Sequence, residues 1–267
     1  MSLSHLYSAT SLESPEFLHV PGLDLAVCTR SSPGDDRANE DGILVLCYAG
    51  ETLVVAVADG AGGYPDGGSA SALALAALET ACAENAALPP RVAILNGFER
   101  AHEAIKDHGG GGATTLAVIE IAGTTLRTYH AGDSGILIAG QRGRIKLQSV
   151  FHSPTGYAVE AGLLDEEEAL HHEHRHMVSN LLGMEPMSVA IGSPIELGRR
   201  DTVVIASDGL YDNLYVPEIV EIVRKGRLAR SCRDLADTAR ERMLNAARGQ
   251  PSKPDDLSVV LLRRTAH

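Results

Sequence analysis

Short apolar runs follow one another along most of this chain and are joined by tight links. Links such as Ala122-Gly123 and Gly132-Asp133-Ser134 permit antiparallel hairpins but are too short for the crossovers that parallel strands need. The pattern therefore predicts a mainly antiparallel sheet structure. The expected strands cover residues 24–29, 42–48, 52–58, 114–121, 125–131, 135–140, 144–150, 202–207 and 257–263.

Longer stretches with helical periodicity separate these strands. Because the strands are too many for one flat sheet, we predict an α+β fold: a central antiparallel β-sandwich with helices packed on both outer faces, in four layers α/β/β/α. Residues 1–23 are expected to form an N-terminal arm, and residues 24–267 a single domain. The expected helices are Gly68 to Ala83, Pro90 to Asp107, two short pieces from Tyr157 to His172, Pro217 to Lys225, and Ser231 to Ala247.

Composition and charge narrow the class of protein. With 267 residues, 44% of them hydrophobic, the chain is long enough for one large core. Its formal net charge of -12 argues against a protein that must neutralise nucleic-acid phosphates over a broad face. The cysteines are scattered without a CxxC pair, which favours reduced thiols and a cytoplasmic location; they are Cys28, Cys47, Cys82 and Cys232.

The sequence also gives no sign of membrane insertion. The amino terminus lacks a basic start followed by an apolar stretch, so we do not expect a secretory signal. The most apolar helical stretch, from Ser69 to Ala83, is short for a bilayer span and carries Glu79. A buried core helix explains this stretch better, and we expect no membrane partner.

Aspartates stand at the ends of several apolar runs. Asp59, Asp133 and Asp208 each close such a run and lie next to a glycine turn, whereas Asp255 and Asp256 open the run LSVVLL. Strand ends are rigid places from which to present a side chain, and glycine allows a close backbone approach. Carboxylate oxygens select hard cations such as Mg²⁺ or Mn²⁺. The pattern predicts an acidic metal site built on a sheet.

The order of these motifs resembles that of the metal-dependent serine/threonine protein phosphatases of the 2C type, particularly their compact bacterial members. The resemblance spans residues 24–263, and no motif in it contains cysteine or histidine. A single Asp-Gly turn would be weak evidence, but six ordered motifs at strand boundaries are specific. They are NED (39–41), DGAGG (59–63), GATT (112–115), GDSG (132–135), SDGLYDN (207–213) and KPDDLS (253–258).

The resemblance implies a metal centre with two Mn²⁺ or Mg²⁺ ions. Asp59 would bridge the ions and the carbonyl of Gly60 would bind one of them, while Asp208 and Asp256 would hold the other and Glu40 would act through water. A water held between two such ions is activated for in-line attack on phosphorus.

Further acidic residues surround this predicted centre. By the same resemblance, Asp133 with Asp208 and Asp212 would bind an optional third ion. Asp41 and Asp255 adjoin ligands, and we expect them to support the site, with a purely backbone-bonding role as the alternative.

Two positions depart from the family pattern. Relatives carry an arginine four residues before the motif glutamate that grips the substrate phosphate, but Asp36 stands there in this chain. Arg37 is the neighbour, and its long guanidinium suits phosphate oxygens, so we assign the phosphate grip to it, with a solvated loop arginine as the alternative. Eukaryotic members also place a histidine where this chain has Ala61, which leaves the general acid unassigned.

Residues from about 151 to 187 correspond to the variable flap of the family. Asp165 is expected to cap an acidic helix start there. The direction of Arg175 is left open by the sequence. Four histidines of this segment could form an accessory metal site, but an exposed polar turn is the favoured interpretation because catalytic spacing is absent; these four are His171, His172, His174 and His176.

The resemblance implies a phosphatase that hydrolyses phosphoserine and phosphothreonine in proteins. We expect a monomer whose partners are a phosphorylated protein substrate and a cognate serine/threonine kinase. Two alternatives remain at this stage: a catalytically silent regulatory or phospho-binding module of the same fold, and a hydrolase of a small phosphate ester, since metal ligands contact only the phosphoryl group.

Overall fold

The computed structural model describes residues 4–34, 37–49, 52–61 and 66–265. These form two compact units, which we describe separately. The first unit comprises Met1–Thr10, Ala38–Ser134 and Asn180–Leu197, and the second comprises Ser11–Arg37, Gly135–Ser179 and Gly198–His267. In the described part of the chain, no helix combines the length and apolar character that crossing a membrane requires.

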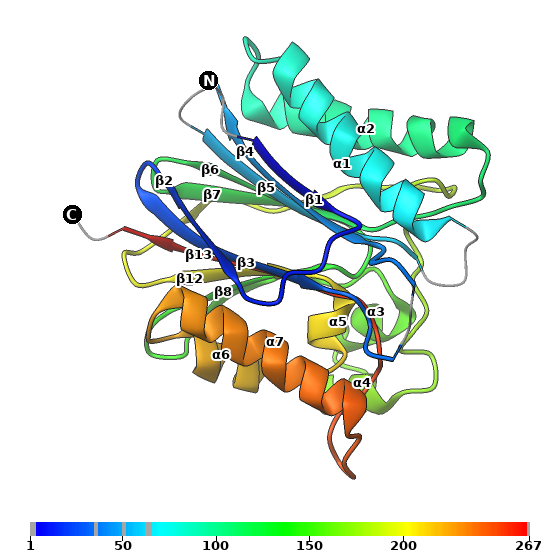
Figure 1. Cartoon of the computed structure of the whole chain (residues 1–267), viewed down its shortest axis with the longest axis vertical. Coiled ribbons are helices and arrows are strands. Elements are labelled where there is room, and N and C mark those ends of the chain that lie inside the picture. The colour runs from blue at the N-terminus through cyan, green and yellow to red at the C-terminus, as the bar shows by residue number, and fades with distance from the viewer. Residues whose placement is uncertain (1–3, 35–36, 50–51, 62–65, 266–267) are drawn as a thin grey trace. The chain divides into compact units, whose positions relative to one another are not determined.

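The first unit is an antiparallel sheet with two helices on one face. Its strands run in the order β1-β4-β5-β6-β7-β10, with β11 also paired to β7. Helices α1 and α2 lie side by side on this sheet (Figure 1). The elements are β1 (Ser4–Ser8), β4 (Asp41–Tyr48), β5 (Thr52–Asp59), α1 (Gly67–Glu84), α2 (Pro90–His108), β6 (Leu116–Ala122), β7 (Thr125–Ala131), β10 (Ala190–Ile191) and β11 (Ile195–Glu196).

Small residues allow α1 to pack closely against both the sheet and α2. The core joins aliphatic side chains of the strands to Leu75 and Leu78 of α1 and Phe98 of α2, all fully buried. At Gly97 an added Cβ would lie 2.6 Å from a methyl carbon of Leu78, so the two helices touch at a position without a side chain. The predicted apolar stretch of α1 is therefore a core helix.

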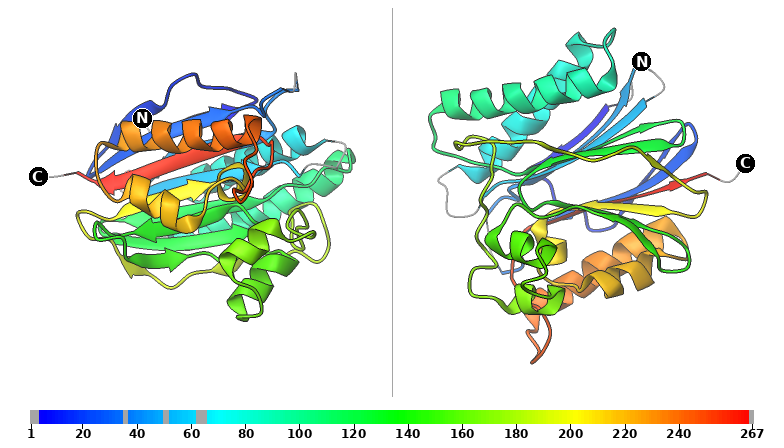
Figure 2. Two further views of the ribbon diagram at one scale, coloured as in Figure 1. Left: turned by 90° about the horizontal axis from the view of Figure 1, so that it is seen from below. Right: turned by 180° about the vertical axis from the view of Figure 1, so that it is seen from behind.

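The second unit is also an antiparallel sheet, in the order β2-β3-β13-β12-β8-β9. Helices α6 and α7 pack on one face of this sheet (Figure 2). Helices α3 and α4 contact each other in the segment after β9. The elements are β2 (Glu16–Val20), β3 (Leu23–Arg30), β8 (Gly135–Ala139), β9 (Ile145–Gln148), α3 (Pro154–Glu160), α4 (Glu166–His171), β12 (Thr202–Ala206), α5 (Asp208–Tyr211), α6 (Val216–Val223), α7 (Leu228–Leu244) and β13 (Leu257–Arg264).

These elements confirm the α+β class with antiparallel sheets, and each predicted strand and helix is present within a few residues of its expected bounds. The prediction of an N-terminal arm is wrong. Residues Ser4–Ser8 pair with β4, and Glu16–Val20 pair with β3, so both segments are edge strands. Their pattern was weak because only Tyr7 of β1 is buried among otherwise exposed or half-buried residues. The single domain over 24–267 stays a prediction.

Candidate functional site

In the first unit, the predicted residues of NED and DGAGG come together at one end of the sheet. Asp41 begins β4 and Asp59 ends β5, and the two are direct partners in the antiparallel register. The next pair continues this contact, because the Gly60 N–H donates to the carbonyl oxygen of Glu40 at 3.2 Å. Register alone therefore brings Glu40, Asp41, Asp59 and Gly60 together. Gly62 and Gly63 of the motif lie outside the described residues.

The GATT motif fixes the backbone of Asp59. The Asp59 N–H donates to Thr115 Oγ1 at 3.1 Å, and the Asp59 carbonyl accepts from Thr115 N at 2.9 Å and from Thr114 Oγ1 at 2.8 Å. Thr115 Oγ1 also lies 2.6 Å from Ser134 Oγ, next to the buried Asp133. Two threonines thus hold the strand end that carries Asp59, a positioning role that the motif alone did not disclose.

Gly60 permits a close approach of the start of α1. A Cβ at Gly60 would lie 2.4 Å from the carbonyl carbon and oxygen of Gly67, the first residue of α1. A Cβ at Gly67 would in turn lie 3.3 Å from Glu40 Oε2. The backbone of the motif therefore packs where any side chain would intrude.

In the second unit, Asp208 opens the one-turn helix α5 directly after β12. Ser207 secures this turn to β13, because its N–H donates to the Ser258 carbonyl at 3.0 Å and its Oγ accepts from Ser258 N at 2.9 Å. A Cβ at Gly209 would lie 1.9 Å from the Asp256 carbonyl oxygen. Glycine is needed at position 209 because α5 touches the backbone of the chain leading into β13.

Three carboxylates of the second unit surround one ammonium group. Lys253 Nζ donates to Asp208 Oδ2 and lies 3.0 Å from Asp212 Oδ2 and 3.0 Å from Asp255 Oδ2. The aspartate and lysine side chains are mostly buried, with exposed fractions from 13% for Asp212 to 35% for Asp255. The structure thus brings Asp208, Asp212 and Asp255 together as an acidic cluster.

The electrostatics of this cluster follow from burial and like charge. Burial raises the pKa of Asp212 to about 6 and that of Asp255 to about 7, and the neighbouring charge of Asp208 adds to both shifts while Lys253 opposes them. Burial alone would lower the pKa of Lys253, but the three carboxylates outweigh it and raise that pKa. Three buried carboxylates that lie this close together favour a bound cation.

Asp256 is placed differently from Asp255. Its Oδ1 accepts a hydrogen bond from Ser32 N at 2.7 Å, and its own N–H donates to Asp255 Oδ1 at 3.0 Å. Asp255 shares Lys253 with Asp208, although the sequence assigned Asp255 only a supporting role. Two adjacent aspartates ahead of a strand could not be told apart by pattern alone.

Buried polar residues hold the acidic cluster in place. The fully buried Asn213 donates from Nδ2 to the carbonyls of Gly209 and Lys253, both at 2.9 Å, and its Oδ1 accepts from Lys253 N at 2.8 Å. Arg242 on α7 donates to the Asn213 carbonyl at 2.8 Å and pairs with Glu218. Sequence reasoning missed Lys253 and Asn213, although both stand inside quoted motifs.

Carboxylate oxygens fit the hard divalent cations that the sequence predicts, and the ammonium of Lys253 shows that this cluster accepts a cation. Among the residues that the structure describes, however, no group of three or more His, Cys, Asp or Glu side chains is arranged so that it could hold a metal ion. In the second unit, the Lys253 ammonium lies between the carboxylates that would do so.

The structure describes two of the positions at which the chain departs from the family pattern, Arg37 and Ala61. Arg37 is exposed, whereas Asp36 lies outside the described residues. Ala61 follows Gly60, and its N–H donates to the Ala113 carbonyl at 2.9 Å, so no side chain with acid chemistry stands at this position. The phosphate grip of Arg37 stays a prediction.

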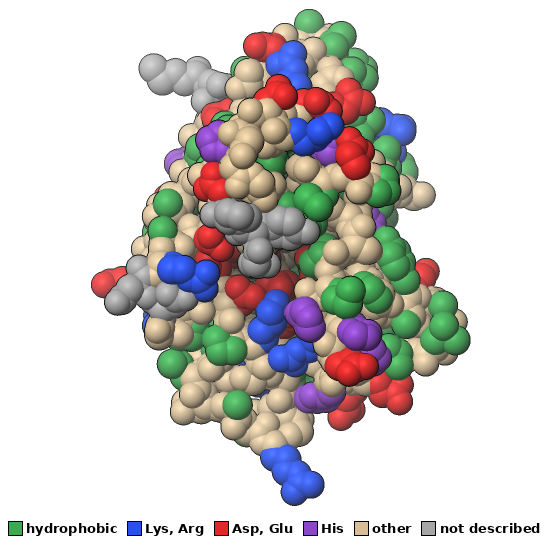
Figure 3. All heavy atoms as spheres, turned by 90° about the vertical axis from the view of Figure 1, so that its right-hand side faces the viewer, with side chains coloured by type: hydrophobic (Ala, Val, Ile, Leu, Met, Phe, Trp, Pro, Cys, Tyr) green, Lys and Arg blue, Asp and Glu red, His purple; other side chains and the backbone are tan. Residues whose placement is uncertain are grey.

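The flap segment folds as its sequence indicates. Asp165 caps α4, accepting from Glu168 N at 2.7 Å while its own N–H donates to Glu168 Oε2 at 2.9 Å. Arg175 donates to the carbonyls of Leu170 and Ser252, which ties the flap to the residue before Lys253. Of the four histidines from His171 to His176, three are exposed, and histidine side chains lie next to acidic and basic ones in the lower half of Figure 3. This agrees with an exposed polar turn.

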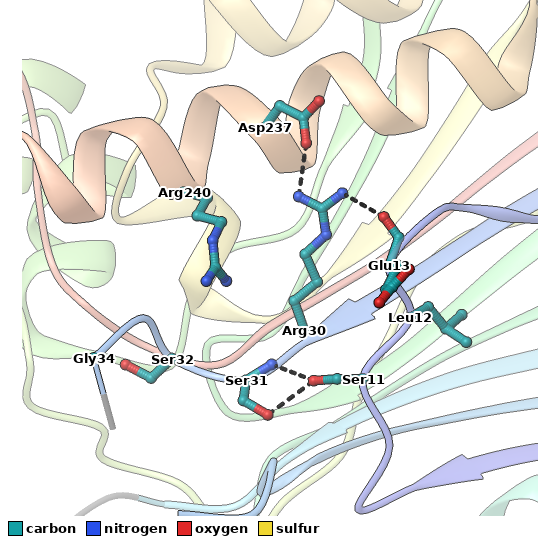
Figure 4. Close-up of a pocket in the computed structure, with 9 residues that line it drawn as sticks. All are labelled: Ser11, Leu12, Glu13, Arg30, Ser31, Ser32, Gly34, Asp237 and Arg240. Atoms are coloured by element: carbon teal, nitrogen blue, oxygen red, sulfur yellow. Dashed lines mark hydrogen bonds and ion pairs between the residues drawn. The ribbon is translucent and has the colours of Figure 1, made fainter. Parts of the chain in front are cut away.

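A surface pocket of about 560 Å³ lies in the second unit, between α7 and the segments around β3. Arg30 crosses it to donate to Asp237 at 2.7 Å and to the Glu13 carbonyl at 3.4 Å, while Arg240 extends from α7 toward the loop of Ser32 (Figure 4). None of the lining residues belongs to the predicted site, and we assign the pocket no catalytic role.

Comparisons with known proteins identify the family of the chain. The family model described as protein phosphatase 2C matches residues 30–250. The chain is 31% identical over 248 residues to the serine/threonine protein phosphatase PstP of Mycobacterium tuberculosis, covering 90% of this chain and 45% of that protein.

Solved structures are similar over the same extent. The S. agalactiae serine/threonine phosphatase superposes with a TM-score of 0.76 at 26% identity, over 91% of this chain and 100% of that one. The catalytic domain of PstP in complex with two manganese ions gives a TM-score of 0.72 at 25% identity, over 91% of this chain and 99% of that one. The chain belongs to the protein phosphatase 2C family.

Proposed function

We propose that this chain, a metal-dependent protein serine/threonine phosphatase, binds Mn²⁺ or Mg²⁺ through its strand-end carboxylates and hydrolyses phosphoserine and phosphothreonine in proteins. The observation that carries the proposal is the convergence of Asp208, Asp212 and Asp255 on one positive charge. Such a cluster, desolvated and anionic, has the donor chemistry of a site for hard cations.

The residues of the two units have separate tasks in this proposal. In the second unit, Asp208 and Asp255 hold a cation, and Ser207 and Asn213 keep their backbone segments in place. In the first unit, Glu40, Asp59 and the Gly60 carbonyl form a second ligand set at the ends of paired strands. That both sets serve a two-ion centre, and that Asp133 and Asp212 add a third ion, stay predictions.

A bound divalent cation would supply charge neutralisation of the phosphoryl group and activation of a water nucleophile. The protein's own contribution is to orient the carboxylates before substrate arrives, because rigid strand ends and buried hydrogen bonds leave little to reorganise. Arg37 would bind phosphate oxygens in a bidentate fashion. No side chain of the protein needs to become phosphorylated.

The geometry favours Asp255 over Asp256 as the ligand beside Asp208. Asp255 shares Lys253 with Asp208, whereas Asp256 accepts from a backbone N–H of the loop after β3. We propose that Asp256 supports the site by holding that loop. This exchanges the roles that the sequence assigned to the two residues.

One experiment tests the activity and the ligand set together. Phosphate release from a phosphothreonine peptide is measured with Mn²⁺, with EDTA, and with the variants Asp208→Ala, Asp255→Asn and Asp256→Asn. We expect full dependence on Mn²⁺, loss of at least about 10³-fold in kcat for the first two variants, and a smaller loss for Asp256→Asn.

The outcomes discriminate between the alternatives. Activity that persists in EDTA would contradict the metal mechanism, and no release by the wild type would favour a silent module. Release from p-nitrophenyl phosphate but not from phosphopeptides would favour a hydrolase of small esters. A large loss with Asp208→Ala and Asp256→Asn, together with a small loss with Asp255→Asn, would restore Asp256 as the ligand.

The setting of the enzyme is a proposal as well. We propose a cytoplasmic monomer that opposes a serine/threonine kinase. The free state of Cys28, Cys47, Cys82 and Cys232 supports a reducing compartment.

A further inference from the structure

Lys253 has its donors directed at three acceptors. An ammonium group carries three N–H donors, and Lys253 Nζ has three aspartate oxygens around it: Asp208 Oδ2, and Asp212 Oδ2 and Asp255 Oδ2 at 3.0 Å each. The lysine side chain is 23% exposed, so most of it is withdrawn from water. This is a satisfied cation site whose occupant is covalently part of the chain.

The backbone of Lys253 is held by hydrogen bonds at both of its polar groups, whereas its side chain is long and unbranched. Asn213 bonds both the N–H and the carbonyl of Lys253, at 2.8 and 2.9 Å, and Arg175 donates to the carbonyl of the preceding Ser252 at 2.8 Å. Beyond Cα, however, four methylene groups allow the ammonium to swing through several ångströms. The anchor therefore stays in place whether or not the ammonium remains with the carboxylates.

We infer that Lys253 is a tethered cation that occupies the metal position of Asp208, Asp212 and Asp255 in the metal-free protein and must leave when a divalent ion binds there. The inference rests on the proposed function, since it takes Asp208 and Asp255 as metal ligands. Lys253 then sets the metal affinity of this enzyme: it competes with the ion for the same oxygens and supports the fold when the ion is absent.

The charges explain why both cations cannot share the position. A divalent ion bound to these oxygens at about 2.0 to 2.6 Å would lie within a few ångströms of an ammonium bound to the same oxygens, and like charges at that separation repel strongly in a partly buried site. Without either cation, three carboxylates would face one another with little water. The lysine thus lowers metal affinity and limits this repulsion at the same time.

Displacement is tested first on the wild-type protein by amine acylation. The protein is treated with an N-hydroxysuccinimide ester in EDTA and in Mn²⁺, and labelling of Lys253 is followed by peptide mass spectrometry. We expect labelling of Lys253 to rise at least about threefold with Mn²⁺, since a group released from an ion pair is accessible. Lys225, 62% exposed in the same unit, is the internal control and should not change. Unchanged or reduced labelling of Lys253 would overturn the inference.

The competition is tested with Lys253→Met, which keeps the length of the side chain and removes its charge. Isothermal titration with Mn²⁺ should show at least about tenfold tighter binding, and the melting temperature in EDTA should fall below that of the wild type. Lys253→Arg keeps the charge and should not tighten Mn²⁺ binding. Equal or weaker Mn²⁺ binding by Lys253→Met, or equal tightening by Lys253→Arg, would refute the competition.

A failure of this inference can be distinguished from a failure of the proposed function. If the proposed ligands are wrong, Asp208→Asn retains the Mn²⁺ affinity of the wild type, whatever Lys253 does. If only the present inference is wrong, Asp208→Asn loses Mn²⁺ while Lys253 shows neither release nor competition.

Discussion

Asn213 bonds both backbone polar groups of Lys253, accepting from its N–H at 2.8 Å and donating to its carbonyl at 2.9 Å. The two residues are 40 positions apart in the chain, yet one side-chain amide provides hydrogen-bond partners for both the backbone N–H and the backbone carbonyl of a residue in the acidic cluster. The same amide reaches the Gly209 carbonyl in α5. Asn213 therefore links the segment of Asp208 to the segment of Asp255.

Replacing Asn213 should damage both stability and catalysis. Asn213→Ala leaves the N–H and the carbonyl of Lys253 without this partner in a buried region, and we expect the free energy of unfolding to fall by about 1–3 kcal/mol. Urea unfolding measures the change, and the matched control Asn245→Ala, at an exposed helix end, should stay close to wild type. A variant as stable as wild type would show that the amide does not hold this loop.

A substitution at Gly60 tests the close contact between Gly60 and Gly67 in the first unit. In Gly60→Ala, the new Cβ would fall 2.4 Å from the Gly67 carbonyl, so we expect a loss of about 1–3 kcal/mol in stability and weaker Mn²⁺ binding. Gly68→Ala is the control: its nearest atom would be Glu40 Cγ at 3.6 Å, an ordinary contact. Equal effects of the two substitutions, measured by melting and calorimetry, would argue against a special role of Gly60.

The ease of prediction differed between residues. Asp59 and Asp208 were readable because each closes an apolar run and precedes glycine, a local signal. Lys253 and Asn213 were not, because their roles depend on contacts across 40 residues that no periodicity records. That Asp255 shares Lys253 with Asp208 could not be read from the sequence, because this contact depends on the turn into β13. The strands of residues 1–23 were missed because edge strands bury few side chains.

The ion pair between Glu218 and Arg242 leads to a prediction about how the stability of the protein depends on pH. Burial would raise the pKa of Glu218, but hydrogen bonds from Arg242 and from the Tyr215 N–H outweigh it and lower that pKa. A carboxylate whose pKa is lowered in the folded state stabilises the protein at pH values above its unfolded pKa of about 4.3. This stabilisation is lost as the pH falls through the folded pKa.

We therefore expect Glu218→Gln to melt lower than wild type at pH 6–8 and the gap to close below about pH 4.3. The loss should be roughly 1 kcal/mol, since Glu218 is partly exposed and solvent screens the pair. Glu241→Gln, exposed on α7, is the control. A gap that stays constant down to pH 3 would mean that the ion pair contributes nothing.

Arg37 is assigned to binding rather than to the chemical step. For Arg37→Ala we expect KM for a phosphopeptide to rise about tenfold, with a smaller change in kcat, because a bidentate contact to the phosphate is lost. Arg233→Ala, an exposed arginine on α7, serves as the control. An unaltered KM would leave Arg37 as a solvated loop residue.

Asp133 decides whether a third ion belongs to this enzyme. It is buried beside Ser134, whose hydroxyl contacts Thr115, so its position is set by the same residues that fix Asp59. If it binds a weaker third ion, Asp133→Ala should lower the Mn²⁺ stoichiometry by about one and reduce activity most at low Mn²⁺, because the weakest site fills last. Calorimetric titration measures the first effect and the Mn²⁺ dependence of phosphate release the second. Asp107→Ala, exposed at the end of α2, controls for loss of charge. Unchanged stoichiometry together with unchanged activity would remove the third site and leave Asp133 as a structural residue.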